Sequence, residues 1–212
     1  TQGVSSAASD VYKRQACNAL RTSPAYDRQK AAGAQFGRVN GWDRPNYFGP
    51  IDADENFDHD SRSFRRGKWW KYAVDEARAI RESVGLIDAT AFTKHIVKGP
   101  GATQFLDWFT CNKLPKIGRI NLTYALTRSG TTRTEYTIVR NGQNDYYLVS
   151  AGAWTAYDSD YLTKAAEDKA AEFGYIEIHD VTNQWGVFAI AGPKTRDVCL
   201  LYTSPSPRDV EE

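Results

Sequence analysis

The chain has 212 residues, of which 41% are hydrophobic and 25% charged, and its formal net charge is +1. This is the composition of an ordinary globular protein, and the balanced charge gives no electrostatic footprint for nucleic acid or an anionic membrane. No apolar run approaches the ~18 residues that a membrane-spanning helix needs, and no secretory signal is visible. We therefore expect neither a nucleic-acid nor a membrane partner.

Cysteine and histidine are too few and too scattered to build a disulfide framework or a metal centre. Cys17, Cys111 and Cys199 are far apart and odd in number, which favours a reducing compartment. The three histidines show no metal-ligand spacing. The acidic stretch 52–60 begins like a calcium-binding loop, but Phe57 occupies the position of the required glycine. We predict a solvated loop there and no metal.

The two ends of the chain differ from the patterned sequence between them. The chain contains no methionine, so we interpret it as an internal part of a longer protein. Residues 1–15 and 201–212 match no periodic pattern, and we interpret both as non-native, adapter-like tails. Residues 16–67 are interrupted by several prolines and glycines. We expect this segment to be the end of a preceding domain, packed by aromatic side chains rather than by regular structure.

Residues 68–200 alternate between helical and strand patterns. Apolar residues recur at helical spacing over 68–84, with Gly85 as the expected stop, and again over 103–109 and 154–173. Two turn signals, residues 128–131 and 141–144, separate three strand-like runs. The predicted strands are 94–98, 121–127, 134–140, 145–150, 175–179 and 186–191.

A weak internal repeat supports this order of strands and helices. A strand, a Gly-Pro pair and a helical pattern follow one another at Gly99-Pro100 and again at Gly192-Pro193. Proline is well placed near a helix start because it has no N–H to leave unpaired. Two such units separated by hairpins predict an α+β fold with mixed or antiparallel sheets and flanking helices.

Glu135 is the best single candidate for a functional residue. It lies in the middle of the second of the three consecutive strands, where a half-buried carboxylate is costly without a partner. Such a group can accept a proton or bind a cationic amine or a guanidine-like heterocycle. The alternative from spacing alone is an ion pair with Arg133 or Arg140.

Several motifs together resemble one family of enzymes. They are Ser23–Arg28, Phe36–Phe48, Glu82–Thr90, Cys111-Asn112 with Gly118-Arg119, Arg133–Arg140 and Gly186–Pro193. In order and spacing, residues from about Thr22 to Cys199 resemble the flavin-dependent dimethylglycine and sarcosine dehydrogenases, at the junction of their central flavoprotein segment and folate-binding domain. From about Val74 onward the chain is also similar to the aminomethyltransferase, or T-protein, of the glycine cleavage system.

The resemblance implies a two-part chemistry. A flavin oxidises an N-methyl amine, and the folate-binding domain captures the one-carbon unit on tetrahydrofolate. Glu135 falls at the strand acid that binds the pterin and helps activate the folate nitrogen in T-proteins, where the family has Asp. Tyr124 and Ser150 match two further positions that contact folate. FAD would be bound by the preceding domain of the same chain, outside these residues.

The resemblance also assigns parts of the chain and a cellular setting. Residues 16–67 would end the flavoprotein segment, and 68–200 would form the first part of the folate-binding domain. The expected function is oxidative demethylation of dimethylglycine or sarcosine with transfer to tetrahydrofolate, in bacterial cytoplasm or the mitochondrial matrix. The alternatives are a free-standing aminomethyltransferase and a non-catalytic folate-binding regulator on the same fold.

Overall fold

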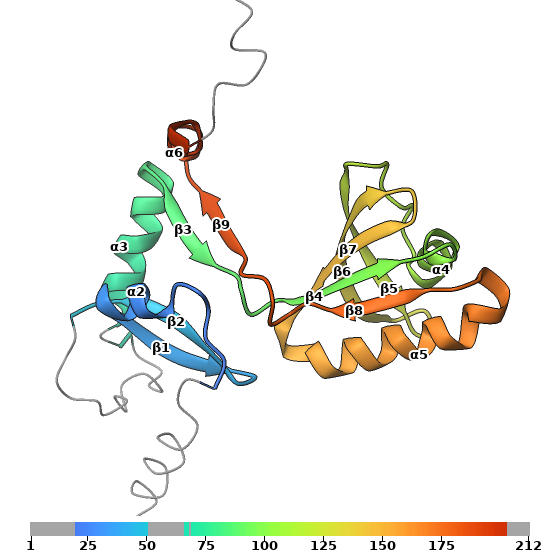
Figure 1. The fold of residues 1–212 in the computed structure, drawn as a ribbon. Helices are drawn as coiled ribbons and strands as arrows, with labels where there is room; N and C mark the ends of the chain where they lie inside the picture. The colour runs from blue at the N-terminus through green and yellow to red at the C-terminus, as the bar shows by residue number, and fades with distance from the viewer. Residues whose placement is uncertain (1–19, 51–65, 68, 203–212) are drawn as a thin grey trace, which may run out of the picture. The chain divides into compact units, whose positions relative to one another are not determined.

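The computed structural model describes residues 20–50, 66–67 and 69–202 and divides into two compact units (Figure 1). One unit combines the chain up to Ala89 with the chain from Phe188 onward, and the other is Thr90–Val187. The tail at 1–15, the acidic stretch 52–60 and residues 203–212 lie outside the described residues. The domain boundary expected at 67/68 stays a prediction.

The described part of the N-terminal segment is regular, so the prediction that it packs without regular structure is wrong. It forms helix α2 and a two-stranded antiparallel hairpin, β1 with β2. Asn40 and Gly41 make the turn with positive φ values of 51° and 81°, which is the geometry that an Asn-Gly hairpin turn requires. The Asn40-Gly41 sequence is itself a hairpin signal, but the prolines and glycines around it favoured an irregular segment. The bounds are α2 Tyr26–Ala31, β1 Ala34–Val39 and β2 Trp42–Phe48.

The predicted helix over 68–84 is confirmed as α3, Trp69–Glu82. Gly85 does not cap it but begins a strand that the sequence did not predict, β3, Gly85–Asp88. A Cβ on Gly85 would lie 2.4 Å from Cγ1 of Ile80, so the glycine allows close packing against the helix. Strand β3 pairs antiparallel with β9, Phe188–Ala191, and helix α6, Thr195–Tyr202, follows β9.

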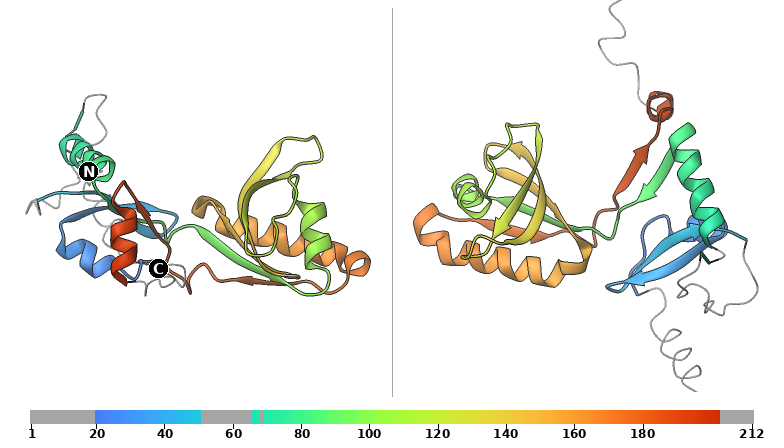
Figure 2. Two further views of the ribbon diagram at one scale, coloured as in Figure 1. Left: turned by 90° about the horizontal axis from the view of Figure 1, so that it is seen from above. Right: turned by 180° about the vertical axis from the view of Figure 1, so that it is seen from behind.

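The unit Thr90–Val187 is built on a five-stranded sheet in the order β5-β6-β7-β4-β8, with every neighbouring pair antiparallel. Figure 2 shows this unit from two further sides, with its long orange helix running along the sheet. Two helices and one 3-10 turn connect the strands. This arrangement confirms the predicted α+β class with antiparallel sheets and flanking helices. The bounds are β4 Thr93–Lys98, α4 Ala102–Phe109, β5 Ile120–Leu126, β6 Thr132–Gly142, β7 Asp145–Ser150, η2 Gly152–Trp154, α5 Thr155–Phe173 and β8 Glu177–Asp180.

The core of this unit lies between one face of the sheet and helices α4 and α5. Along β6 the side chains of Tyr136 and Ile138 are fully buried, whereas Glu135, which precedes Tyr136, is exposed. Phe105 of α4 and Leu162 of α5 complete the same buried cluster. Period-two alternation therefore places Glu135 on the sheet face opposite the helices.

Both predicted hairpins of the sheet are present. Strands β5 and β6 are joined through Thr127–Thr131, with a backbone hydrogen bond between these two residues. Between β6 and β7 the turn is Gln143-Asn144, and Asn141-Gly142 belongs to the strand, next to an irregularity in the register after Arg140. The second hairpin turn thus occupies the latter half of the predicted segment.

The repeated strand, Gly-Pro and helix order is also confirmed. Gly99 follows β4 with φ +113°, and Gly192 follows β9 with φ +129°. In each case the first helical residue comes two positions after the proline, at Ala102 and Thr195. None of the described helices is long and apolar enough to cross a bilayer.

Candidate functional site

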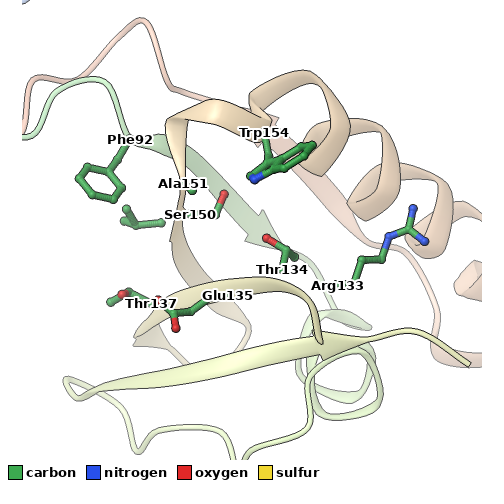
Figure 3. Close-up of a pocket in the computed structure, with 9 residues that line it drawn as sticks. Phe92, Arg133, Thr134, Glu135, Thr137, Ser150, Ala151 and Trp154 are labelled. Atoms are coloured by element: carbon green, nitrogen blue, oxygen red, sulfur yellow. The ribbon is translucent and has the colours of Figure 1, made fainter. Parts of the chain in front are cut away.

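A pocket of about 260 Å³ opens in the Thr90–Val187 unit, where β6 extends past the end of β7 (Figure 3). Its wall combines one acid and one base with hydroxyl groups and apolar surfaces. The acid is Glu135 and the base is Arg133, both on β6. The complete lining is Phe92, Arg133, Thr134, Glu135, Thr137, Val149, Ser150, Ala151 and Trp154.

The backbone after β7 creates this opening. The recorded pairing of β6 with β7 begins at Thr137 and Val149, while β6 continues toward residue 132 paired with β5 alone. Beyond Ser150 the chain turns sharply into η2. A Cβ on Gly152 would lie 1.9 Å from the carbonyl oxygen of Ala91, so glycine is what lets the turn pass so close to that backbone.

Glu135 faces Tyr124 directly across β5 and β6. A hydrogen bond with Glu135 raises the pKa of the Tyr124 phenol, and the negative charge of the carboxylate adds to the effect. Two of the three predicted site residues are therefore in contact. Their position follows from the hairpin register, because directly opposed residues on one face lie about 5 Å apart.

The ion pair considered as the alternative for Glu135 is absent among the ion pairs of the described residues. Arg140 donates instead to the carbonyl oxygens of Gly142 and Gln143. Arg133 lies over the rings of two tyrosines of α5. Glu135 is also exposed rather than half-buried, and it lines the pocket. Within the described part of the chain, Tyr124 is the partner of its carboxylate.

Ser150, the third predicted site residue, lies in the pocket wall but turns its hydroxyl elsewhere. The side chain is buried, and its Oγ donates a hydrogen bond of 2.6 Å to Oδ2 of Asp158 on α5. Thr134 donates to the same oxygen at 3.3 Å. The structure thus brings Glu135 and Tyr124 together on one face and ties Ser150 to the opposite, helix-covered face. Contact of any of the three with a ligand stays a prediction.

Asp158 is a polar residue next to the site that sequence reasoning missed. It is fully buried, and its Oδ1 has no hydrogen-bond partner in the described part of the chain. Burial raises the pKa of this carboxyl, and the hydrogen bonds from Ser150 and Thr134 oppose the rise. Asp158 lies four residues before Leu162, which is buried on the same helix. This helical spacing is the sequence signal that could have indicated an inward-facing Asp158.

His95 lies on β4 beside this buried cluster. Its Nε2 is 2.7 Å from Oγ of Ser159, and its Nδ1 has no partner among the described residues. Burial lowers the pKa of His95, while the charges of Asp180 and Asp158 act in the other direction. The burial of His95 and its hydrogen bond with Ser159 indicate a structural role for this side chain. In the described part of the chain no three His, Cys, Asp or Glu side chains are grouped as metal ligands would be.

An α+β domain with a mixed-charge pocket at the end of a central hairpin defines the class of this protein. The particular family follows from comparison with known proteins. The chain belongs to the GCVT N-terminal domain family, whose model matches residues 25–209. The match includes residues 201–209, which the sequence alone assigned to a non-native tail, and that assignment stays a prediction.

Two curated relatives and one solved structure place the chain further. It is 31% identical to rat (Rattus norvegicus) mitochondrial dimethylglycine dehydrogenase over 170 residues, covering 80% of this chain and 19% of that protein. It is 29% identical to the regulatory subunit of mouse (Mus musculus) mitochondrial pyruvate dehydrogenase phosphatase, covering 89% of this chain and 22% of that protein. The chain spans about a fifth of the length of both.

The solved structure supports the fold. The aminomethyltransferase T of the glycine cleavage system from Bartonella henselae superposes with a TM-score of 0.66 at 24% identity, covering 84% of this chain and 42% of that one. The comparisons confirm the resemblance at the level of the domain: a GCVT-type domain homologous to dimethylglycine dehydrogenase.

Proposed function

We propose that the pocket on β6 binds the pterin of tetrahydrofolate, in a protein that oxidatively demethylates dimethylglycine or sarcosine and passes the one-carbon unit to the folate. One observation carries the proposal. Glu135 presents a carboxylate at a pocket, and no cation pairs with it among the ion pairs of the described residues. The 31% sequence identity to dimethylglycine dehydrogenase supports the choice of reaction. FAD would supply the oxidation from a part of the protein outside this chain.

The residues of the pocket fit a pterin. Its exocyclic amine and ring N–H present two donors side by side, and a carboxylate can accept both, as it does from a guanidinium. Phe92 and Trp154 supply flat apolar surface on the other walls. The cavity of about 260 Å³ is slightly smaller than the roughly 300–1,000 Å³ of sites that surround a whole small molecule. It matches a ring better than an entire folate.

The side chains of this chain have simple roles in that scheme. Glu135 would orient the ring and could hold a proton while the folate nitrogen reacts. Tyr124 would keep the carboxylate in one rotamer through their hydrogen bond. Glu is one methylene longer than the Asp of the family, and the pocket must place it correctly for the same contact.

The binding half of the proposal is tested by calorimetry of tetrahydrofolate on the purified chain. We expect Glu135→Gln to weaken binding about tenfold or more, because the amide cannot accept both donors and carries no charge. Glu167→Gln is the matched control, since Glu167 is exposed on α5 and does not line the pocket. An unchanged dissociation constant in Glu135→Gln would overturn the proposal.

A second candidate function has a specific observation behind it. The similarity to a phosphatase regulatory subunit favours a non-catalytic, folate-binding regulator. The full protein that contains this chain separates the two candidates. Loss of folate-dependent product in Glu135→Gln, with amine oxidation intact, supports transfer. Loss of folate binding in a protein that has no amine-oxidising turnover supports the regulator.

A further inference from the structure

Arg133 is held in an unusual way at the pocket. It lies two residues before Glu135 on β6 and lines the same cavity. Its guanidinium carbon is 3.8 Å from the ring centroid of Tyr161 and 4.7 Å from that of Tyr157, both on α5. Stacking of this kind stabilises an arginine by cation–π attraction and restricts its rotamers without using its N–H groups.

In the described part of the chain no acid forms an ion pair with this guanidinium, although its positive charge acts to lower the pKa of the buried Asp158. Among the ion pairs and hydrogen bonds of the described residues, none involves the Arg133 side chain. The Asp158 carboxylate accepts hydrogen bonds from Ser150 and Thr134 instead. Glu135 interacts with Tyr124 across the hairpin. Five N–H donors in a fixed plane therefore lie at the pocket, and no carboxylate of the described residues accepts a hydrogen bond from them.

We propose that Arg133 binds a carboxylate of the ligand whose ring or amine is held by Glu135. This inference rests on the proposed function and adds a second contact to it. Alternate residues of a strand are about 6.6 Å apart, and Figure 3 shows the two side chains pointing in different directions, Arg133 toward α5. The pocket thus selects molecules with a hydrogen-bond-donating end and a separate carboxylate end.

Two sources could supply that carboxylate. One is the glutamate tail of the folate, and the other is the N-methyl amino acid that provides the one-carbon unit. Arginine suits either, since its planar fork matches a carboxylate in a bidentate manner. The charge attraction predicts that binding weakens as salt rises, because screening acts on an exposed pair.

The test compares three probes by calorimetry on the wild-type chain and on Arg133→Gln: tetrahydrofolate, a tetrahydropterin that lacks the glutamate tail, and dimethylglycine. If the tail is the carboxylate, Arg133→Gln weakens tetrahydrofolate about five- to tenfold and leaves the tail-less pterin unchanged. If the amino acid is the source, dimethylglycine alone is weakened by a similar factor. In either case the salt dependence of the affected probe is reduced in the variant.

Arg128→Gln is the matched control, because Arg128 is exposed in the turn that joins β5 and β6, outside the pocket, and its change alters the net charge equally. Arg133→Lys keeps the charge and a cation–π attraction to the tyrosines but loses the planar fork. We expect it to weaken binding less than glutamine does, and it decides the question if Arg133→Gln unfolds, as measured by thermal melting.

The outcomes separate this inference from the proposed function. Equal weakening of the tailed and tail-less pterin would show that Arg133 acts on the site as a whole and would overturn the carboxylate contact. Binding of every probe unaffected by Arg133→Gln would also overturn it, while leaving pterin binding by Glu135 in place. If the wild-type chain binds none of the three probes, both the proposed function and this inference are wrong.

Discussion

Asp158 carries a buried charge or a buried proton within the helix-covered face of the sheet. Its carboxyl accepts the hydroxyl hydrogens of Ser150 and Thr134 through one oxygen and leaves the other without a partner in the described residues. An unpaired buried polar atom is a source of instability. The same carboxyl fixes Ser150 and Thr134, which both line the pocket. Asp158 therefore shapes the pocket wall from behind.

Two substitutions of Asp158 separate its roles as acceptor and as charge. Asp158→Ala should lower the free energy of unfolding by about 2–4 kcal/mol, because two buried hydroxyls lose their acceptor and a cavity forms. Asp158→Asn keeps an acceptor oxygen and should cost much less at neutral pH, where the wild-type carboxyl is penalised by burial. Urea unfolding at pH 7 measures both; an alanine variant as stable as the asparagine variant would contradict this role.

The difference in stability between the wild type and Asp158→Asn should depend on pH in a known direction. The folded pKa of Asp158 is raised above its ordinary value of 3.8, so the folded state binds more protons than the unfolded state between the two values. The stability from this site is complete below 3.8 and is lost as the pH rises through the folded pKa. The wild type should therefore gain stability relative to Asp158→Asn as the pH falls from neutral toward 4.

The sequence allowed part of the site to be predicted, residue by residue. Glu135 and Tyr124 are opposed because the hairpin turn and the alternation along both strands set the register, and those signals are local. Ser150 was placed near the site, but the direction of its hydroxyl depends on Asp158, which is distant from Glu135 in sequence and reaches the sheet only through tertiary packing. As a site residue, Arg133 was considered from the sequence only as an ion-pair partner of Glu135, since nothing local indicates that α5 brings two tyrosines to it.

At the scale of elements, the loop from β4 to α4 depends on one glycine. Gly99 has a φ of +113°, and a Cβ there would lie 2.6 Å from the carbonyl oxygen of Tyr175. Both the backbone angle and the space thus exclude a larger residue. Gly130, in the turn between β5 and β6, has a φ of +81° but nothing within 4 Å of a Cβ. Substitution of Gly130 therefore tests the cost of backbone strain alone, and substitution of Gly99 tests strain together with steric overlap.

We expect Gly99→Ala to lower the free energy of unfolding by about 2–4 kcal/mol, because strain adds to the clash with backbone. Gly130→Ala should lower it by about 1 kcal/mol, the cost of the left-handed backbone alone. Both glycines lie in the Thr90–Val187 unit, so one urea titration compares them. Equal losses in the two variants would show that the close approach to Tyr175 is relieved by a small shift.

Elements with strong periodicity were predicted well, and elements defined by short or interrupted patterns were not. Helices α3, α4 and α5 have apolar stripes that a single sequence shows. Strand β3 is four residues long and follows a helix at once, so its pattern is too short to separate from a loop. The hairpin of β1 and β2 contains Pro45, which lies beside an irregularity in the register, and proline in a run argues against a strand.

At the scale of the whole molecule, the pocket belongs to a unit whose two ends meet. Thr90 begins the unit, and its Oγ1 accepts a hydrogen bond of 3.1 Å from the backbone N–H of Val187, the last residue. Every residue of the pocket wall lies between these two positions. The buried cluster that supports the sheet is also formed within them. One continuous segment thus contains its own core, the pocket and a hydrogen bond that joins its first and last residues.

These features predict that residues 90–187 fold and bind tetrahydrofolate without the rest of the chain. A segment with its own core should unfold in one cooperative urea transition, and its dissociation constant should equal that of the longer chain. Leu162→Ala in the same fragment is the control. It is expected to lower the free energy of unfolding by about 2–5 kcal/mol, because Leu162 is fully buried in that core. A fragment that folds but fails to bind would show that the pocket needs residues from the other unit. A fragment with no cooperative transition would show that the two units share one folding reaction despite the separate core.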